Sequence, residues 1–177
     1  MLNSACKLFL TEGYGSVTVD QVMKDSKLTR GAFYGHFSSK ADIYSEAIKF
    51  AIANSKFVRT SDASNDDHVW LGELLDGYLS LEHVRGRNPC PLAFLATDIV
   101  ARDKAARRAY SEAYENVNNV ILSYAKKYTA CSKQEVLAIT AMVIGTVAIA
   151  RTLDNACAVK DLLAACRTDV GLKLGGI

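Results

Sequence analysis

Helix start signals recur along this chain and restrict it to a helical fold. Thr18 and Gln21 have the spacing of a capping box, in which two side chains satisfy free backbone N–H groups at a helix start. Ser132 and Glu135 repeat the pattern much later in the chain. Only two prolines interrupt 177 residues, so little of the chain is barred from a helix. The sequence therefore predicts an all-α fold of about nine helices.

Composition excludes several other classes of protein. Half of the residues are hydrophobic and 23% are charged, which is typical of a globular domain. The most apolar stretch, residues 139–150, is shorter than a membrane span, and no signal peptide is recognisable. We therefore expect a cytoplasmic protein with no membrane partner. Five scattered cysteines form no metal-binding or disulfide pattern, which predicts that most of them are reduced, buried thiols and that the protein holds neither metal nor cofactor.

Apolar periodicity divides the chain into a part with short helices and a part with long ones. We predict helices near residues 2–10, 18–26, 29–37 and 39–58, then longer ones near 67–84, 91–102, 104–128, 135–153 and 155–173. The intervening residues 59–67 are rich in Ser, Asp and Asn and predict a loop. The second and third helices are joined by about three residues, which is the spacing of a helix-turn-helix.

The second helix of this motif carries glycines on its outer face. On a wheel of about 100° per residue the outer arc holds, in order, Arg30, Tyr34, Gly31 and Gly35, while Phe33 lies on the other side. Exposed helical glycines cost roughly 1 kcal/mol each relative to alanine. That cost is offset where the backbone must approach another rigid surface, and a DNA major groove is such a surface. The pattern predicts a DNA recognition helix.

Neighbouring side chains suit contacts with DNA. Arg30 lies in the first turn, where its guanidinium can pair with guanine, and Tyr34 offers a ring and a hydroxyl. Lys40, at the start of the next helix, places a cation beside a helix amino terminus, and both attract phosphate. Thr18 can also bind phosphate, although capping alone accounts for it. His36 fits either a phosphate contact or packing against the core.

These residues belong to a longer similarity. Residues 8–48, "LFLTEGYGSVTVDQVMKDSKLTRGAFYGHFSSKADIYSEAI", resemble the amino-terminal domain of the TetR/AcrR family of bacterial transcriptional regulators. The residues that match the family's pattern in order and spacing are Phe9-x-x-x-Gly13-Tyr14, Thr18-Val19 and Tyr34-x-His36-Phe37-x-x-Lys40. "NPCPLAFLATDIVARD" and "AMVIGTVAIARTLDN" also resemble regulatory-domain segments in some branches of the family.

The resemblance implies a homodimeric repressor that binds a palindromic operator and is released by an inducer. It implies a helix-turn-helix DNA-binding domain over residues 1–46 and a helical ligand-binding and dimerisation domain over residues 47–177. The residues implied at or near DNA are Thr29, Arg30, Gly31, Tyr34, Gly35, His36 and Lys40, to which the argument above adds Thr18. Family members usually have several residues before the first helix, so either this arm is absent here or the start codon lies upstream.

The helix near residues 135–153 is apolar almost all round. Small residues (Ala138, Ala141, Gly145 and Ala148) interleave there with Ile139, Met142, Val143 and Ile149. Such a helix is buried on more than one side. A second subunit packed on it and on the last helix, which carries Leu162, Leu163 and Ala165, would form a symmetric interface. The alternative is a central core helix in a monomer.

An inducer pocket needs apolar walls with a few polar groups. We predict that at least three of seven residues line one cavity for a small apolar or aromatic compound, although each alone can be ordinary core. The seven are Trp70, Leu74, Tyr78, Phe94, Tyr110, Tyr114 and Met142.

Two other functions remain open, and an enzyme is disfavoured. Cys90 precedes Pro91 at a predicted helix start, where the dipole can lower a thiol pKa, so a redox- or electrophile-sensing repressor is one alternative. A helical interaction protein without DNA binding is the other, because residues 1–50 hold six Lys/Arg against five Asp/Glu. The sequence contains no HExxH, GxSxG or phosphate-loop motif, which argues against an enzyme.

Overall fold

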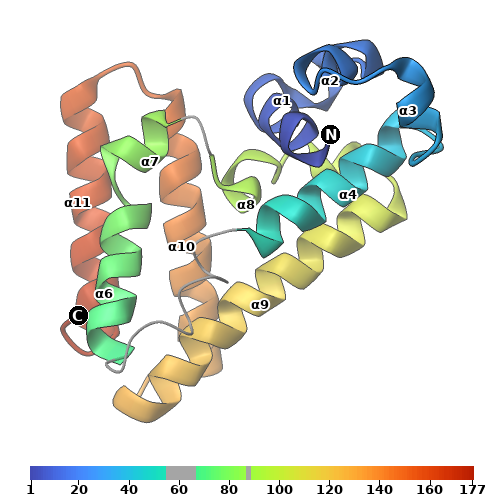
Figure 1. Ribbon diagram of the computed structural model, residues 1–177. Coiled ribbons are helices and arrows are strands. Elements are labelled where there is room, and N and C mark those ends of the chain that lie inside the picture. The colour runs from blue at the N-terminus through green and yellow to red at the C-terminus, as the bar shows by residue number, and fades with distance from the viewer. Residues whose placement is uncertain (55–66, 87–88) are drawn as a thin grey trace. The chain divides into compact units, whose positions relative to one another are not determined.

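The computed structural model describes residues 1–54, 67–86 and 89–177 of the chain (Figure 1). These residues form ten α-helices and one short 3-10 helix and contain no strand, so the all-α prediction is confirmed. The elements are α1 (Leu2–Ser16), α2 (Val19–Asp25), α3 (Arg30–Tyr34), α4 (Lys40–Ala53), α6 (Asp67–Tyr78), α7 (Leu81–Arg85), α8 (Pro91–Phe94), η1 (Ile99–Ala101), α9 (Lys104–Tyr128), α10 (Lys133–Thr152) and α11 (Ala156–Lys173).

Two compact units divide these helices. The first comprises Met1–Ser55 and Arg87–Ala113, and the second comprises Lys56–Gly86 and Tyr114–Ile177. α9 begins in the first unit and ends in the second. The predicted boundary at residue 46 separates a DNA-binding function from ligand binding and dimerisation, which the two compact units do not test. That boundary stays a prediction.

Local capping chemistry sets most helix starts. The Thr18 hydroxyl accepts from the backbone N–H of Gln21 at 3.2 Å, and the Gln21 side chain accepts from the backbone N–H of Thr18 at 2.6 Å. Ser132 and Glu135 form the same reciprocal pair at the start of α10, at 3.3 and 2.7 Å. The two predicted capping boxes are therefore confirmed, because they need only residues three positions apart.

Two of the predicted long helices are wrong, because each is divided. The helix predicted near 67–84 stops at Tyr78, and a new one begins at Leu81, where the Ser80 hydroxyl caps the chain by accepting from the backbone N–H of His83 at 3.1 Å. The helix predicted near 91–102 shrinks to the single turn of α8 and the 3-10 turn of η1. Ser80 is a strong N-cap within an apolar pattern, and its signal competes with helix propagation.

Some helix ends also differ from the prediction. α1 continues to Ser16 across a kink at Gly13, whose φ of 77° lies in the left-handed region, and α3 ends at Tyr34 rather than near Phe37. The predicted extension of α4 towards residue 58 and most of the loop predicted at 59–67 lie outside the described residues.

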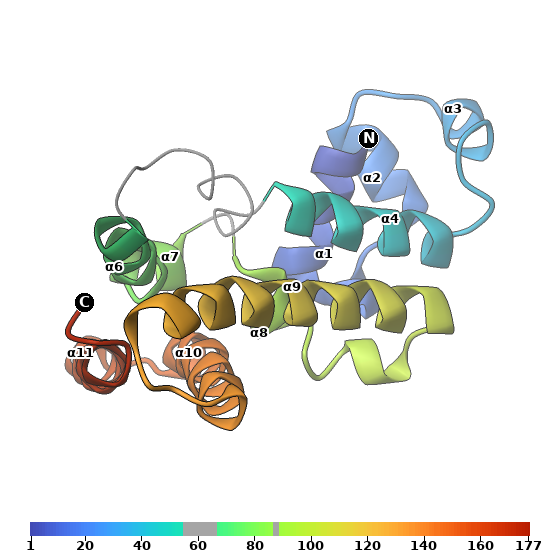
Figure 2. The same ribbon diagram turned by 90° about the horizontal axis from the view of Figure 1, so that it is seen from below.

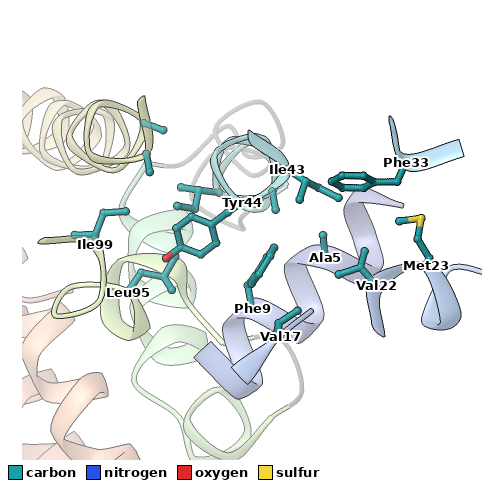
Figure 3. Packing of buried hydrophobic residues seen from close by; sticks show 14 residues of the cluster. Ala5, Phe9, Val17, Val22, Met23, Phe33, Ile43, Tyr44, Leu95 and Ile99 are labelled. Atoms are coloured by element: carbon teal, nitrogen blue, oxygen red, sulfur yellow. The ribbon is translucent and has the colours of Figure 1, made fainter. Parts of the chain in front are cut away.

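Aromatic packing between α1 and α4 forms the core of the first unit (Figure 3). Phe9 and Tyr44 meet edge to face, with ring centroids 4.9 Å apart, and both are buried. Phe33 of α3 is fully buried in the same cluster. Leu95 at the end of α8 and Ile99 at the start of η1 join this cluster, so residues from much later in the chain complete the core around the helix-turn-helix.

Four helices pack together in the second unit. α10 contacts α11 and α7, while α6 contacts α11 and α7 (Figures 1 and 2). Arg85 at the end of α7 donates to the backbone oxygen of Leu153 at 2.6 Å, and Arg151 of α10 donates to that of Val84 at 3.3 Å. Each arginine thus neutralises the carboxyl end of the other's helix. Among the described residues α10 is the one helix that is long and apolar enough to cross a membrane, by length and composition only, and in this unit it packs against α7 and α11.

None of the five cysteines forms a disulfide in the structure, and they are not all buried. Cys166 is buried and Cys157 is exposed. Cys6 is partly buried and donates to the backbone oxygen of Ala47 at 2.8 Å, and this burial raises the pKa of its thiol to about 12. Cys6 is therefore a neutral packing residue at physiological pH.

Candidate nucleic-acid interface

A tight turn connects α2 to α3. Lys27 in this turn has a φ of 56°, the one positive φ of a non-glycine residue in the described part of the chain. The backbone N–H of Leu28 then donates to the carbonyl oxygen of Met23 at 2.9 Å. Thr29 caps α3 by accepting from the backbone N–H of Ala32 at 3.3 Å. These contacts and the buried ring of Phe33 fix which side of α3 faces outwards.

The outer side of α3 carries the four residues of the predicted arc. Arg30, Gly31, Tyr34 and Gly35 are all exposed. Tyr34 is an aromatic residue that is nonetheless 59% exposed, with its ring edge to face with that of Phe33 at 5.0 Å. The arrangement offers a planar cation, an aromatic hydroxyl and bare backbone on one surface.

The two glycines have no explanation inside the protein. A Cβ atom built at Gly31 would lie 3.8 Å from the nearest side-chain atom, and one at Gly35 would lie 3.6 Å from the nearest backbone oxygen. Both are ordinary van der Waals distances, and neither residue has a positive φ. Alanine would therefore fit both positions, so packing among the described residues does not require glycine at either one.

The polar residues around α3 are held loosely. The Nε of Arg30 lies 3.5 Å from an oxygen of Asp20, and both side chains are 65% exposed. Exposed ion pairs of this kind contribute little to stability, so Arg30 can exchange this partner for another. Thr18 and Thr29 are exposed although their hydroxyls cap helices. His36 is exposed too, rather than packed in the core.

Lys40 lies at the first position of α4, beside a cluster that the sequence did not reveal. Its Nζ is 4.2 Å from the centroid of the Tyr14 ring, and the guanidinium of Arg102 is 4.1 Å from the same centroid. Asp98 pairs with Arg102 at 3.2 Å. Asp98 and Arg102 stand four residues apart, a signal compatible with a helical pair, but nothing in the sequence connects them to Lys40.

The residues predicted to line an inducer pocket fall in both units. Phe94 and Tyr110 belong to the first, where the Tyr110 hydroxyl donates to the backbone oxygen of Leu92 at 2.7 Å. The other five belong to the second unit, namely Trp70, Leu74, Tyr78, Tyr114 and Met142. A single cavity lined by three of them stays a prediction. Cys90, the candidate thiol sensor, is half-buried and precedes α8, a helix of only four residues. Sensing by this thiol stays a prediction.

Several known proteins are similar to this chain, most strongly over the segment that holds α2 and α3. Residues 1–47 match the family model described as bacterial regulatory proteins, tetR family. The TetC protein of transposon Tn10 from Escherichia coli is 39% identical over 49 residues, which are 28% of this chain and 25% of TetC. The HTH-type transcriptional regulator LmrA of Bacillus subtilis is 25% identical over 166 residues, which are 88% of this chain and 86% of LmrA.

The fold is shared over nearly the whole chain. The crystal structure of reduced NemR from Escherichia coli matches with a TM-score of 0.80 at 14% identity, over 97% of this chain and 94% of NemR. The sequence match to the family's amino-terminal domain, the long match to LmrA and the helical fold point to one conclusion. The chain belongs to the TetR/AcrR family of bacterial transcriptional regulators.

Proposed function

We propose that this regulator represses transcription in the cytoplasm by binding a palindromic operator as a homodimer, and that a small apolar or aromatic inducer releases it. In this proposal Arg30, Gly31, Tyr34 and Gly35 enter the major groove, and Thr18, Thr29, His36 and Lys40 contact the backbone nearby. The observation that carries the proposal is the pair of exposed glycines. The protein itself leaves room for a methyl group at both, whereas a major groove in close contact with α3 would not.

Dimer formation through α10 and α11 is supported by apolar residues on their surfaces. Ile149 of α10 is 54% exposed and Leu172 of α11 is 74% exposed. Small residues Ala138 and Ala141 of α10 and Ala165 of α11 are exposed as well. Exposed apolar residues on neighbouring helices are typical of symmetric interfaces. In a dimer the two α3 helices would reach successive major grooves, about 34 Å apart.

An inducer site in the second unit is supported by a buried hydrogen-bond donor, the indole of Trp70, that has no acceptor among the described residues. The indole Nε1 of Trp70 is buried and has no hydrogen-bond partner among the described residues. A buried N–H without a partner is costly, and a ligand acceptor would satisfy it. We therefore propose an inducer that presents a hydrogen-bond acceptor to Trp70 from an otherwise apolar body. Its binding would favour a dimer whose recognition helices no longer fit successive grooves.

The first prediction concerns Arg30. Arg30→Ala should weaken binding to the DNA upstream of the protein's own coding region by about 2 kcal/mol for each half-site, because it removes a pairing with guanine. Tyr34→Phe should weaken binding less. Arg108→Ala, whose side chain is 82% exposed on α9, should change affinity by less than about twofold. Titrations at two salt concentrations measure all three, and a shallow salt dependence of the wild type would favour the interaction protein instead.

Glycine substitution should separate stability from binding. Gly31→Ala should raise the free energy of unfolding by about 0.5 kcal/mol, because alanine restricts the unfolded chain and favours a helix. The same methyl group should cost about 1–3 kcal/mol of operator binding through overpacking. Gly77→Ala in α6, where a Cβ would meet nothing within 4 Å, is the matched control and should leave DNA affinity unchanged. Equal operator affinity for Gly31→Ala and wild type would contradict the proposal that the backbone of α3 lies close to the DNA at Gly31.

A charge on α10 should dissociate the dimer. Ile149→Glu should raise the dimer dissociation constant about 100-fold or more, because burying the unpaired charges of both subunits costs at least about 3 kcal/mol in total. Sedimentation equilibrium measures this constant. Val100→Glu, at a side chain that is 71% exposed in the first unit, should leave it unchanged. A monomeric wild type at micromolar concentration would contradict the proposal.

The chain's one tryptophan should report inducer binding. A compound that releases the operator should change the fluorescence of Trp70, and Trp70→Phe should bind that compound about 1 kcal/mol more weakly through loss of the indole donor. Calorimetry measures the second effect, with Tyr128→Phe at a 42% exposed position as control. An inducer that releases DNA without either effect would place its site elsewhere.

A further inference from the structure

Five side chains meet where α1 ends and α4 begins, all within the first unit. The Tyr14 ring contacts the cations of Lys40 and Arg102 at 4.2 and 4.1 Å, and its centroid lies 4.9 Å from that of Tyr44. The Tyr44 hydroxyl donates to Asp98 at 2.7 Å. Arg102 and Asp98 come from the ends of η1, whereas the other three come from α1 and α4.

Asp98 has both carboxylate oxygens engaged. One accepts from Arg102 at 3.2 Å and the other accepts from the Tyr44 hydroxyl. The side chains of Arg102 and Asp98 are only 21% and 26% exposed, and Tyr44 is buried. The pKa of Tyr44 is raised by burial first and by Asp98 second, so its hydroxyl stays a donor. The Asp98–Arg102 pair is therefore a fixed element rather than a mobile surface contact.

Lys40 is the cation of this cluster that lacks a carboxylate. No ion pair of Lys40 occurs among the described residues, and the nearby Asp42 accepts instead from the backbone N–H and hydroxyl of Ser38, at 2.9 and 3.0 Å. The pKa of Lys40 is lowered by burial and by the charge of Arg102, and Asp98 opposes this shift. The cluster thus holds two cations and one carboxylate beside the amino terminus of α4. It therefore carries one positive charge that no carboxylate of the cluster balances.

We infer that Arg102 is a positioning residue for DNA binding: by pairing with Asp98, it keeps the Lys40 ammonium available for a phosphate of the DNA backbone. The inference rests on the proposed function, since it explains how one proposed phosphate contact is maintained. Arg102 lies far outside the helix-turn-helix segment, and it acts through Lys40 rather than by touching DNA itself.

The reason is competition for a single carboxylate. If Arg102 is removed, Asp98 becomes a mostly buried carboxylate that keeps only a hydroxyl partner, which is unfavourable. Lys40 shares the Tyr14 ring with Arg102 and already interacts electrostatically with Asp98, so it is the cation placed to replace Arg102. A lysine paired with Asp98 inside the cluster no longer neutralises a phosphate. Removal of Asp98 as well abolishes the competition and frees Lys40 again.

The test compares operator affinity and its salt dependence for the full chain and four variants. Arg102→Met should weaken binding about tenfold and lower the slope of log affinity against log salt by about one for each subunit, because one phosphate contact is lost. The double variant Arg102→Met with Asp98→Asn should restore most of both. Arg102→Lys, which keeps the pair, should bind like wild type. Arg108→Met removes the same charge from an exposed position and should change affinity by less than about twofold.

Each other outcome has a distinct meaning. If the double variant binds as weakly as Arg102→Met or more weakly, Arg102 acts through structure or direct contact, and the inference is wrong. If Arg102→Met binds like Arg108→Met, the inference is also wrong. Thermal unfolding of every variant identifies loss of binding through misfolding. If Arg102→Met does not fold, the folded Arg102→Lys and double variants decide: a salt slope like that of the wild type supports the inference, and a slope lower by about one for each subunit contradicts it. A wild type that does not bind operator DNA overturns the proposed function instead, and this inference with it.

Discussion

The orientation of α3 depends on the burial of one ring. A helix of five residues is too short to be stable on its own, because its nucleation cost exceeds the few hydrogen bonds that it makes. Phe33 is fully buried among residues of α1, α2 and α4, and its ring also packs against those of Tyr34 and Phe37. The cap at Thr29 then fixes the start of the helix. Everything that the outer side of α3 can offer to DNA is held in place by these few contacts.

The parts of the fold that local chemistry determines were predictable from the sequence. The capping residues at Thr18, Thr29, Ser39, Ser132 and Asn155 begin helices where they were expected, because each acts on a backbone N–H two or three residues away. The exposed arc of α3 follows from helical periodicity and one apolar residue. DNA contact by these residues stays a prediction.

The parts that depend on distant contacts were not predictable. The segment near 91–102 has helical periodicity, yet Asp98 there bonds to Tyr44, which is 54 residues earlier. Leu95 and Ile99 pack into the core around the helix-turn-helix for the same tertiary reason, and the single-turn α8 is the result. The pocket residues are a further example, because spacing along a helix does not reveal which of two units an aromatic side chain joins.

The left-handed backbone of Lys27 determines which substitutions can make this domain more stable. A left-handed backbone at a residue with a Cβ costs roughly 1–2 kcal/mol, and glycine or asparagine avoids much of that cost. The turn between α2 and α3 is thus a place where the domain is less stable than its fold allows, and the residue responsible is not on the outer arc of α3. Random variants selected only for heat resistance would therefore be expected to gain glycine or asparagine at this turn, leaving intact the outer arc of α3 that we propose contacts DNA.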